Sequence, residues 1–200
     1  GGAAGAMVSG ALRGAVGRAQ ALARSRDLLG KYVVEKQLAS GGMGVVYRAR
    51  YCPEGGFVRD VAIKKIHPHL AVQPRLVQAF RQEAGLCARL LHPNIVQVMD
   101  FGRADDTYFL AMEYVDGQTL LDVMRRAQRV APFLPPRWVA YIGREVCEGL
   151  HFAHAVAVDD RGHPLRVIHR DLNPPNVIIS RSGHVKLMDF GIAKALKEKA

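Results

Sequence analysis

The stretch that begins at His169 places the tightest limits on what this chain can fold into. It reads His-Arg-Asp-Leu-Asn-Pro-Pro-Asn from His169 to Asn176, and an Asp-Phe-Gly triplet begins at Asp189. Short apolar runs around 180–183 predict a hairpin between the two motifs. A loop and the foot of a hairpin would bring these side chains together. Asp171 could then accept the proton of a hydroxyl nucleophile, and Asn176 and Asp189 could bind Mg²⁺ through their oxygens. The stretch therefore predicts a phosphoryl-transfer site.

The composition is that of an ordinary globular chain of 200 residues, with 49% hydrophobic and 23% charged residues. This length suffices for one large domain or two small lobes. The three cysteines, Cys52, Cys87 and Cys147, lie far apart, which argues against a disulfide framework and a zinc site and favours a reducing, cytoplasmic setting. No apolar stretch approaches the ~20 residues that cross a bilayer. We therefore expect no membrane contact within these residues, while an anchor beyond residue 200 stays open.

The formal net charge is +10, but the basic residues are spread along the whole chain. Their densest groups lie in 125–129 and 194–199. This spread favours a solvated surface over a nucleic-acid footprint, so we expect no nucleic-acid partner. A basic nucleic-acid binder remains an alternative class, which salt-sensitive retention on DNA would support.

The hydrophobic pattern divides the chain into an extension, 1–29, and two parts, 30–115 and 116–200. The extension is rich in Gly and Ala and dotted with Arg, and we expect it to be disordered or weakly helical. Residues 31–50 and 57–66 are rich in Val, Ile and Tyr and are separated by a Pro/Gly turn. This pattern predicts antiparallel strands.

A helix is predicted after Pro74, because apolar residues up to Leu91 recur at helical spacing. Strands are predicted at 95–101 and 107–114, which gives about five strands with one helix inserted. From Gly117 onward the pattern becomes helical again.

The clearest helical stretch is 138–154, where Trp138, Ile142, Val146 and Ala153 share a face. We expect part of this face to remain uncovered within these residues and to form an apolar patch prone to association. The segment 156–166 predicts a loop or a small hairpin.

A Gly-rich segment, Leu38 to Tyr47, lies between two predicted strands. This context excludes a Rossmann turn and a Walker loop, because both need a helix directly behind the glycines. Glycines in a hairpin let backbone N–H groups close over phosphates without a side chain in the way. By itself, the segment favours a plain Gly-rich β-turn over a phosphate-binding loop.

The strand sequence Val-Ala-Ile-Lys puts Ala62 and Lys64 on one face, which suits a flat ring and its phosphates. On the following helix, Glu83 falls on the same stripe as Phe80 and Cys87 and so projects toward the sheet. A carboxylate there needs a cation, and Lys64 is the best-placed candidate. A solvent-facing Lys64 and a peripheral Glu83 are the alternatives.

Taken together, the H-R-D-x-x-x-x-N motif, the downstream D-F-G, the V-A-I-K strand and the Gly-rich hairpin resemble the motif set of eukaryotic-type protein kinases, in particular the bacterial serine/threonine subgroup. The resemblance covers about 30–200. It implies an α+β, bilobal fold, with a five-stranded antiparallel N-lobe sheet, one helix and the hinge in 30–115. An incomplete, mainly helical C-lobe would occupy 116–200. It also implies ATP and Mg²⁺ as cofactors and a protein substrate that receives the γ-phosphoryl group on a Ser or Thr hydroxyl.

The same resemblance implies a role for each matched position. Lys64 would hold the α- and β-phosphates and pair with Glu83. Asp171 would be the catalytic base, and Asn176 and Asp189 would be the metal ligands. The positions expected to enclose the nucleotide are Leu38, Ala39, Ser40, Gly41, Gly42, Met43, Gly44, Val46, Ala62, Met112, Glu113, Val115 and Ile178.

At the hinge, the resemblance makes Met112 the gatekeeper, and the backbone of Glu113 and Val115 would bind adenine. The resemblance also implies a set of side chains that stack on one another in the active state. Its members are His169, Phe190, Cys87 and Val98.

Three features depart from the family pattern. Ala39 replaces the first glycine of the loop, which is a mild change. Asn173, counted among the catalytic positions, stands where a lysine usually touches the γ-phosphate, so we expect slower transfer or a substitute cation. The family's A-P-E motif does not occur after the D-F-G within these 200 residues. We therefore expect these residues alone to be weak or inactive, with a nucleotide-binding pseudokinase or regulatory scaffold as the alternative.

Overall fold

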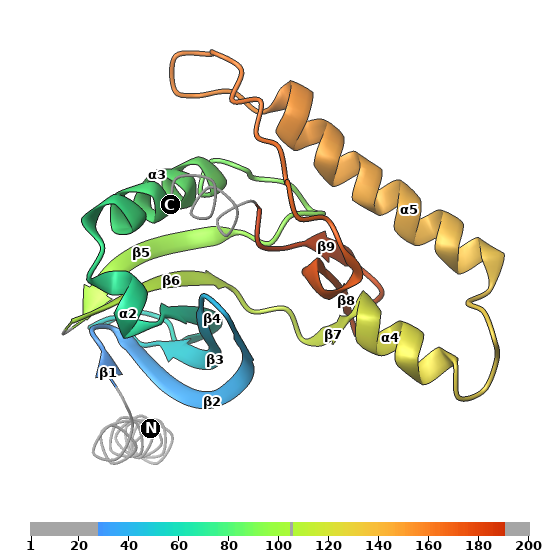
Figure 1. The fold of residues 1–200 in the computed structure, drawn as a ribbon, viewed down its shortest axis with the longest axis horizontal. Coiled ribbons are helices and arrows are strands. Elements are labelled where there is room, and N and C mark those ends of the chain that lie inside the picture. The colour runs from blue at the N-terminus through green and yellow to red at the C-terminus, as the bar shows by residue number, and fades with distance from the viewer. Residues whose placement is uncertain (1–27, 105, 191–200) are drawn as a thin grey trace, which may run out of the picture.

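The structure is a computed structural model that describes residues 28–104 and 106–190 (Figure 1). The expected extension, 1–29, lies outside these ranges except at its end. There Leu28–Leu29 form the short strand β1, so the sheet begins two residues before the predicted start at Gly30. Across the described ranges, no helix is long and apolar enough to span a membrane.

An antiparallel six-stranded sheet forms the first part of the molecule, in the order β1-β2-β3-β4-β6-β5. Besides β1, its strands are β2 (Tyr32–Gly41), β3 (Gly44–Tyr51), β4 (Arg59–Ile66), β5 (Val98–Ala104) and β6 (Thr107–Glu113). The five longer strands confirm the predicted antiparallel sheet, and β1 adds a two-residue edge to it.

The two faces of the sheet contribute to different core clusters. On β4, Val61 and Ile63 pack in a smaller cluster with Tyr32 and Phe109. Ala62 belongs to the larger cluster on the opposite face. The predicted alternation along this strand is therefore confirmed, because successive strand side chains point to opposite faces.

A polar contact joins β2 and β5, which stand far apart in the strand order. The Tyr32 hydroxyl donates to Oδ2 of Asp100 at 2.9 Å, and Lys31 approaches the same oxygen at 3.0 Å. Burial raises the pKa of Asp100, but the bonds from Lys31 and Tyr32 outweigh it and hold the pKa below its ordinary value. The sheet must therefore curl around the smaller cluster, so that its distant strands meet.

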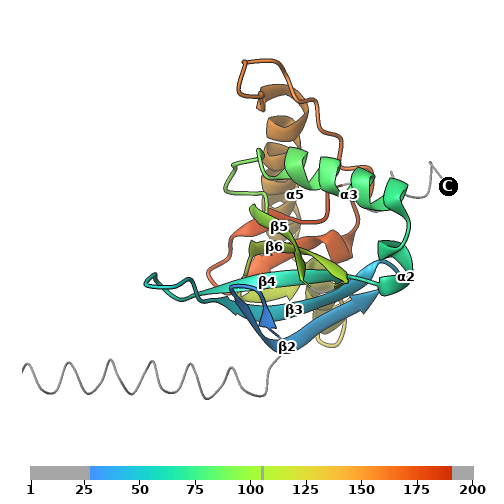
Figure 2. The same ribbon diagram turned by 90° about the vertical axis from the view of Figure 1, so that its left-hand side faces the viewer.

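Helix α3 (Pro74–Cys87) covers the other face of the sheet, beside β5 (Figure 2), and follows the four-residue α2 (Pro68–Ala71). Proline occupies the first turn of α3, where its missing N–H costs nothing. The helix ends at Cys87, earlier than the predicted apolar spacing up to Leu91, and Leu91 is 68% exposed.

A second, three-stranded sheet consists of β7 (Gly117–Thr119), β8 (Val177–Ser180) and β9 (Val185–Leu187). The β8–β9 hairpin confirms the one predicted around 180–183. The helical prediction from Gly117 was wrong for its first three residues, which pair with β8. A Cβ at Gly117 would lie 2.2 Å from the carbonyl oxygen of Ile179. Pairing with the neighbouring strand, and not local propensity, therefore determines the extended conformation of this segment.

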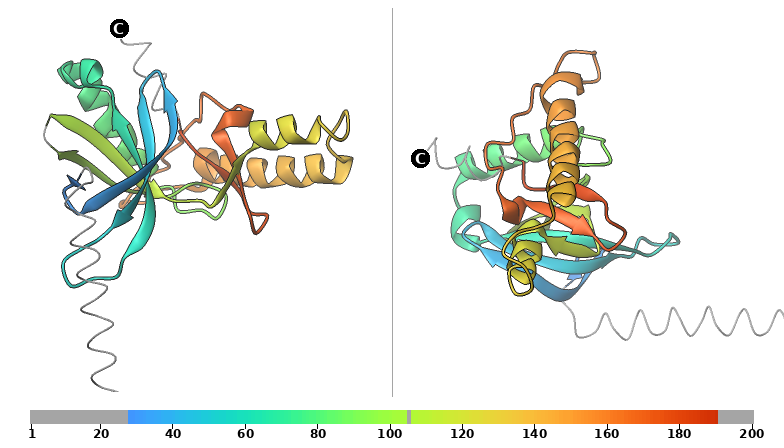
Figure 3. Two further views of the ribbon diagram at one scale, coloured as in Figure 1. Left: turned by 90° about the horizontal axis from the view of Figure 1, so that it is seen from below. Right: turned by 90° about the vertical axis from the view of Figure 1, so that its right-hand side faces the viewer.

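Helices α4 (Leu120–Ala127) and α5 (Pro136–His151) lie beyond this hairpin, on the side away from the six-stranded sheet (Figure 3). Helix α5 continues into a π-helical turn, Phe152–Val156. Val158 then bridges to Pro164, as the predicted small hairpin requires.

The predicted apolar face of α5 is only partly buried. Ala153 is fully buried, and Ile142 and Val146 pack against the larger core cluster. Trp138, however, is 50% exposed and does not share this burial. An apolar groove of about 420 Å³ lies between α4 and α5, so the expected uncovered apolar surface is present.

One core cluster connects both parts of the molecule. It contains Phe80 of α3, Leu110 of β6 and Leu187 of β9. The buried Asn94 adds polar links, because its Nδ2 donates to Oε2 of Glu145 on α5 at 2.8 Å and to the carbonyl of Val185 at 2.9 Å. The second sheet is thereby held against the first part through packing and hydrogen bonds.

Candidate functional site

The Gly-rich segment forms the tight turn between β2 and β3, with Gly41 paired to Gly44. A Cβ at Gly44 would lie 1.9 Å from the carbonyl oxygen of Lys65 on β4, so strand packing alone requires glycine there. Gly41 and Gly42 have open space where a Cβ would be, and neither has a positive φ. Packing within the described chain does not explain these two glycines, whereas a ligand lying close to the backbone would.

The other predicted loop residues are exposed or half-buried on the same hairpin. They are Leu38, Ala39, Ser40, Met43 and Val46. The hairpin therefore presents mainly backbone and small side chains at its tip.

Besides Met43, five of the positions predicted to enclose the nucleotide have side chains within or against the larger core cluster. They are Val46, Ala62, Met112, Val115 and Ile178. They come from β3, β4, β6, the connection after β6, and β8. The structure thus brings residues from both parts of the chain to one apolar region, next to Lys64.

Lys64 contacts Asp189, although 125 positions separate them. Its Nζ donates to Oδ1 at 2.7 Å, with the lysine side chain 10% exposed and the aspartate side chain 30% exposed. The predicted partner of Lys64 was Glu83. Position 83 lies on α3 between the buried Phe80 and Cys87, but its side chain is outside the described part of the structure. The Lys64–Glu83 pair stays a prediction.

The loop that begins at His169 is tied together by its own amides. Asn176 donates from Nδ2 to the carbonyl oxygen of Asp171 at 2.9 Å and to Oδ2 of its carboxylate at 3.0 Å. The backbone N–H of Met188 donates to the carbonyl of Asn176 at 3.0 Å. Asp171, Asn176 and the residue before Asp189 are therefore in direct contact, as the motif spacing predicts.

Asn173 begins the short 3-10 helix Pro174–Asn176. Its Oδ1 accepts the N–H of Asn176 at 3.2 Å, which is the bond of an N-cap. The prediction for Asn173 concerns only its missing charge. The signal for the cap was available, since asparagine followed by proline is a typical helix start.

His169 is 2% exposed, and its ring centroid lies 4.5 Å from that of Phe190. Nε2 must donate to the Met188 carbonyl at 3.1 Å, because a carbonyl only accepts, while Nδ1 accepts the Asp171 N–H at 3.4 Å. Burial lowers the pKa of His169, opposed in part by the Met188 bond. The imidazole is thus held neutral with the proton on Nε2.

The other two members of the predicted stacked set lie beside Phe190. Cys87 and Val98 are buried and, together with Phe190, border one small cavity. The Cys87 thiol lies 3.8 Å from the carbonyl of Phe190. All four members, including His169, are therefore close together.

The backbone departs from ordinary geometry at two motif residues. Arg170 has φ of 60° and Asp189 has φ of 59°, a region that residues other than glycine rarely adopt. Such conformations persist where surrounding contacts enforce them, and they cluster at functional sites.

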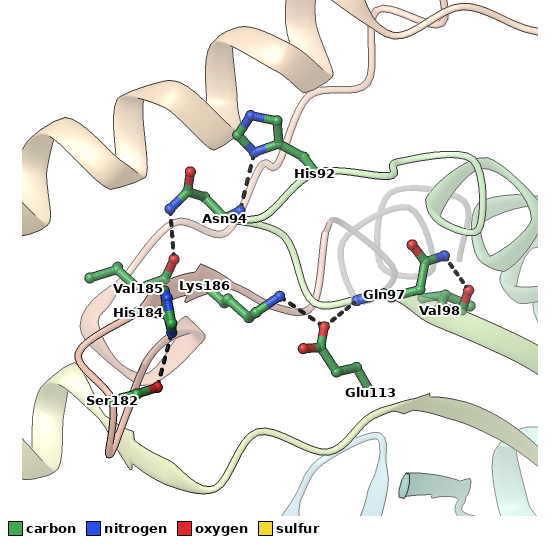
Figure 4. A network of polar contacts seen from close by, with 9 residues as sticks. All are labelled: His92, Asn94, Gln97, Val98, Glu113, Ser182, His184, Val185 and Lys186. Atoms are coloured by element: carbon green, nitrogen blue, oxygen red, sulfur yellow. Dashed lines mark hydrogen bonds and ion pairs between the residues drawn. The ribbon is translucent and has the colours of Figure 1, made fainter. Parts of the chain in front are cut away.

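Glu113, at the end of β6, is held through both its main chain and its carboxylate (Figure 4). Its N–H donates to the carbonyl of Gln97 at 2.8 Å. Its Oε2 accepts from Nζ of Lys186 at 3.0 Å and from the N–H of Gln97 at 3.3 Å. Sequence reasoning considered only the backbone of Glu113, and no local pattern signals a pair separated by 73 positions.

This chain is similar in sequence to bacterial proteins named as protein kinases. The tyrosine-protein kinase MasK of Myxococcus xanthus is 42% identical over 166 residues, covering 83% of this chain and 26% of that protein. The serine/threonine-protein kinase PknB of Mycolicibacterium smegmatis is 38% identical, covering 86% of this chain and 26% of that protein. This chain thus spans about a quarter of the length of each of these curated relatives.

Among solved structures, the kinase domain of PknI from Mycobacterium tuberculosis matches with a TM-score of 0.68 and 34% sequence identity. The match covers 85% of this chain and 63% of that one. A family model described as the protein kinase domain matches residues 32–200. The chain therefore belongs to the protein kinase domain family and is of the eukaryotic type that occurs in bacteria.

Proposed function

We propose that the protein is an ATP- and Mg²⁺-dependent kinase that transfers the γ-phosphoryl group to a serine or threonine hydroxyl of a protein. The observation that carries the proposal is the 2.7 Å contact between Lys64 Nζ and Asp189 Oδ1. A lysine on the sheet and a carboxylate from the distant motif meet at the edge of an apolar region. A phosphate chain needs such a cation, and a metal on that chain needs such a carboxylate.

The residues fit Mg²⁺ as a partner of bound phosphate. Both contacts of the Asn176 Nδ2 are with Asp171, which leaves its Oδ1 as the amide atom for a cation, and carboxylate and amide oxygens suit Mg²⁺. Across the described ranges, no group of three His, Cys, Asp or Glu residues could hold a metal by itself. Asn176 and Asp189 would therefore hold the ion together with phosphate oxygens, and the ion would neutralise phosphate charge there.

The residues also fit ATP. Ala62, Met112 and Ile178 contribute apolar surface for a planar base. The open space at Gly41 and Gly42 leaves the hairpin backbone accessible to phosphate oxygens. In this arrangement Lys64 orients the phosphates, and the backbone of Glu113 and Val115 reads the base.

Asp171 would accept the proton of the substrate hydroxyl. Two contacts from Asn176 Nδ2, one of them to its carboxylate oxygen, orient it without neutralising its charge. The neutral Nδ1 of His169 accepts its backbone N–H. The proposed base is thus positioned by uncharged groups.

The test is transfer of labelled phosphate from ATP to a generic protein substrate. Asp171→Asn removes the base but keeps an oxygen that accepts from Asn176, so we expect transfer to fall by about 10²-fold or more while binding of Mg²⁺·ADP is kept. Asp106→Asn is the matched control, because the Asp106 side chain lies between β5 and β6, is 99% exposed and pairs with Arg103. Undiminished transfer in Asp171→Asn would refute the assigned base.

A tyrosine acceptor is the second candidate. It is favoured by the name of MasK, a relative at 42% identity. Phosphoamino-acid analysis of the labelled product separates the candidates. Phosphotyrosine alone would replace the first proposal with the second.

A weakly active or inactive protein that uses the same site only to bind nucleotide is the remaining alternative for these residues. The missing charge of Asn173 favours it. The grouping of Lys64, Asp171, Asn176 and Asp189 argues against it. Saturable nucleotide binding with no transfer to any acceptor, including the chain itself, would support this alternative.

A further inference from the structure

His67 connects the start of α2 with the tip of the Gly-rich hairpin. Its ring Nε2 lies 2.8 Å from the carbonyl oxygen of Gly41, and its backbone N–H donates to the carbonyl of Met43 at 3.1 Å. A carbonyl oxygen only accepts, so the ring donates its Nε2 proton. One residue thus bonds both sides of the turn between β2 and β3.

Because His67 lies at the start of a helix, the bond from its ring to the Gly41 carbonyl is unusual. His67 is the residue that immediately precedes α2, where a side chain commonly accepts a bond from the first turn of the helix. The His67 side chain makes no such bond. Its ring stacks on that of His69, with centroids 5.5 Å apart and planes 18° apart.

Apart from the bonds of His67, the hairpin turn is held by pairing of Gly44 with Ile66 on β4 and by packing of Met43. The Met43 side chain packs against the larger core cluster. Gly41 and Gly42 have no atoms within 4 Å of the position of a Cβ, so no close packing of the described chain restrains the tip there. Within residues 28–104 and 106–190, the polar side-chain bond to the tip comes from His67.

We propose that His67 is a positioning residue, which fixes the hairpin tip and thereby sets the affinity for the nucleotide phosphates. The inference rests on the proposed function, because it assumes that the phosphates lie under this hairpin. A restrained tip holds its backbone N–H groups in the binding arrangement before the ligand arrives, so less conformational freedom is lost on binding. His67 itself touches no reacting atom.

The first test measures the hairpin directly, without nucleotide. Hydrogen exchange of the amides of residues 41–46 should be faster in His67→Ala than in the wild type. It should return toward the wild-type rate in His67→Gln, whose side-chain amide can also donate. His69→Ala is the matched control, because it removes the neighbouring ring and leaves the His67 donor in place. Exchange in β5 reports whether each variant is folded.

The second test measures nucleotide binding in the same proteins. The dissociation constant for Mg²⁺·ADP should rise about two- to tenfold in His67→Ala, the range that one hydrogen bond supports, and recover in His67→Gln. In a transfer assay, the change should appear in KM for ATP and not in kcat.

Unchanged exchange of the hairpin in His67→Ala would overturn the inference. So would faster exchange with unaltered Mg²⁺·ADP affinity, because the tip would then be irrelevant to binding. Equal effects of His67→Ala and His69→Ala would also overturn it, by showing a general disturbance of α2. Absence of nucleotide binding in the wild type would instead reject the proposed function, and the exchange measurement distinguishes that case.

Discussion

The side chain of Asn173 affects both the charge near a bound phosphate and the stability of the turn that follows it. Asparagine lacks the positive charge that lysine would bring to a phosphate, and its Oδ1 caps the turn that presents Asn176. Removing that cap in Asn173→Ala should lower the free energy of unfolding by about 1 kcal/mol. Asn173→Asp keeps an acceptor oxygen and should retain most of the stability. Denaturant unfolding of both variants provides the comparison, and equal losses would exclude the cap as the cause.

Asn173→Lys tests the charge separately. The added cation should accelerate transfer if phosphate charge limits the rate, but the lost cap should lower stability as in Asn173→Ala. Rates must therefore be compared at temperatures where both proteins are fully folded. An unchanged transfer rate under those conditions would contradict the expectation that Asn173 slows the reaction.

His169 should make stability depend on pH. Burial lowers its pKa below the ordinary 6.5, so the unfolded chain takes up a proton at a pH where the folded protein does not. The unfolded state then binds more protons, and stability falls as the pH drops below about 6.5. His92 contributes in the same direction, because burial also lowers its pKa.

The measurement is the free energy of unfolding between pH 7.5 and 5.5. His169→Gln should flatten the pH dependence, since glutamine does not titrate and can still donate to the Met188 carbonyl. His154→Gln is the control, because His154 is exposed. A slope that is the same in His169→Gln and the wild type would show that His169 is not the group responsible.

At the scale of the elements, the β2–β3 hairpin contains glycines that are needed for different physical reasons. Gly44→Ala would place a Cβ 1.9 Å from the Lys65 carbonyl and push β3 away from β4. We expect a loss of about 1–3 kcal/mol, as for overpacked sites. Gly42→Ala meets open space and should keep the stability while weakening nucleotide binding. Thermal unfolding and Mg²⁺·ADP titration of the two variants would show whether the effects separate in this way.

The closure of the six-stranded sheet depends on the contact between β2 and β5. Asp100→Ala would leave the hydroxyl of Tyr32, a residue only 2% exposed, without its acceptor. The expected loss is about 2 kcal/mol, the typical penalty for a buried unsatisfied group. Asp60→Ala removes an exposed partner of Arg48 and should change the unfolding midpoint little. A double-mutant cycle with Tyr32→Phe would isolate the pair, and a coupling energy near zero would contradict this role.

Local patterns were sufficient to predict some of these elements. The alternation of Ala62 and Lys64 and the apolar stripe with Phe80 and Cys87 follow from the periods of a strand and a helix. Strand β7 was missed because Gly117 is extended only through pairing with β8. Pairing is a tertiary effect, which local propensity does not encode.

In the candidate site, too, some contacts follow from the local sequence and others only from the tertiary fold. The proximity of Asp171 to Asn176 follows from their spacing on one loop. The contact of Lys64 with Asp189 and that of Glu113 with Lys186 join residues far apart in sequence. Only the folded chain determines which of several available charges a lysine meets.

At the scale of the whole molecule, the candidate site depends on the contacts that hold the two parts of the chain together. The larger core cluster has members in α3, the six-stranded sheet and β9. Lys186 of β9 bonds Glu113 at the end of β6, and Lys64 of β4 bonds Asp189 just after β9. The proposed base, the proposed metal ligands and the proposed phosphate-binding lysine therefore depend on one arrangement of both parts.

The most direct test of the account is the equilibrium binding of ADP to the protein with and without Mg²⁺. We predict saturable binding that becomes at least about tenfold weaker when Mg²⁺ is chelated or in Asp189→Asn, as for loss of a metal–carboxylate contact. Asp171→Asn should bind as the wild type does. The account would be contradicted by an absence of saturable binding, or by binding that neither chelation of Mg²⁺ nor Asp189→Asn alters.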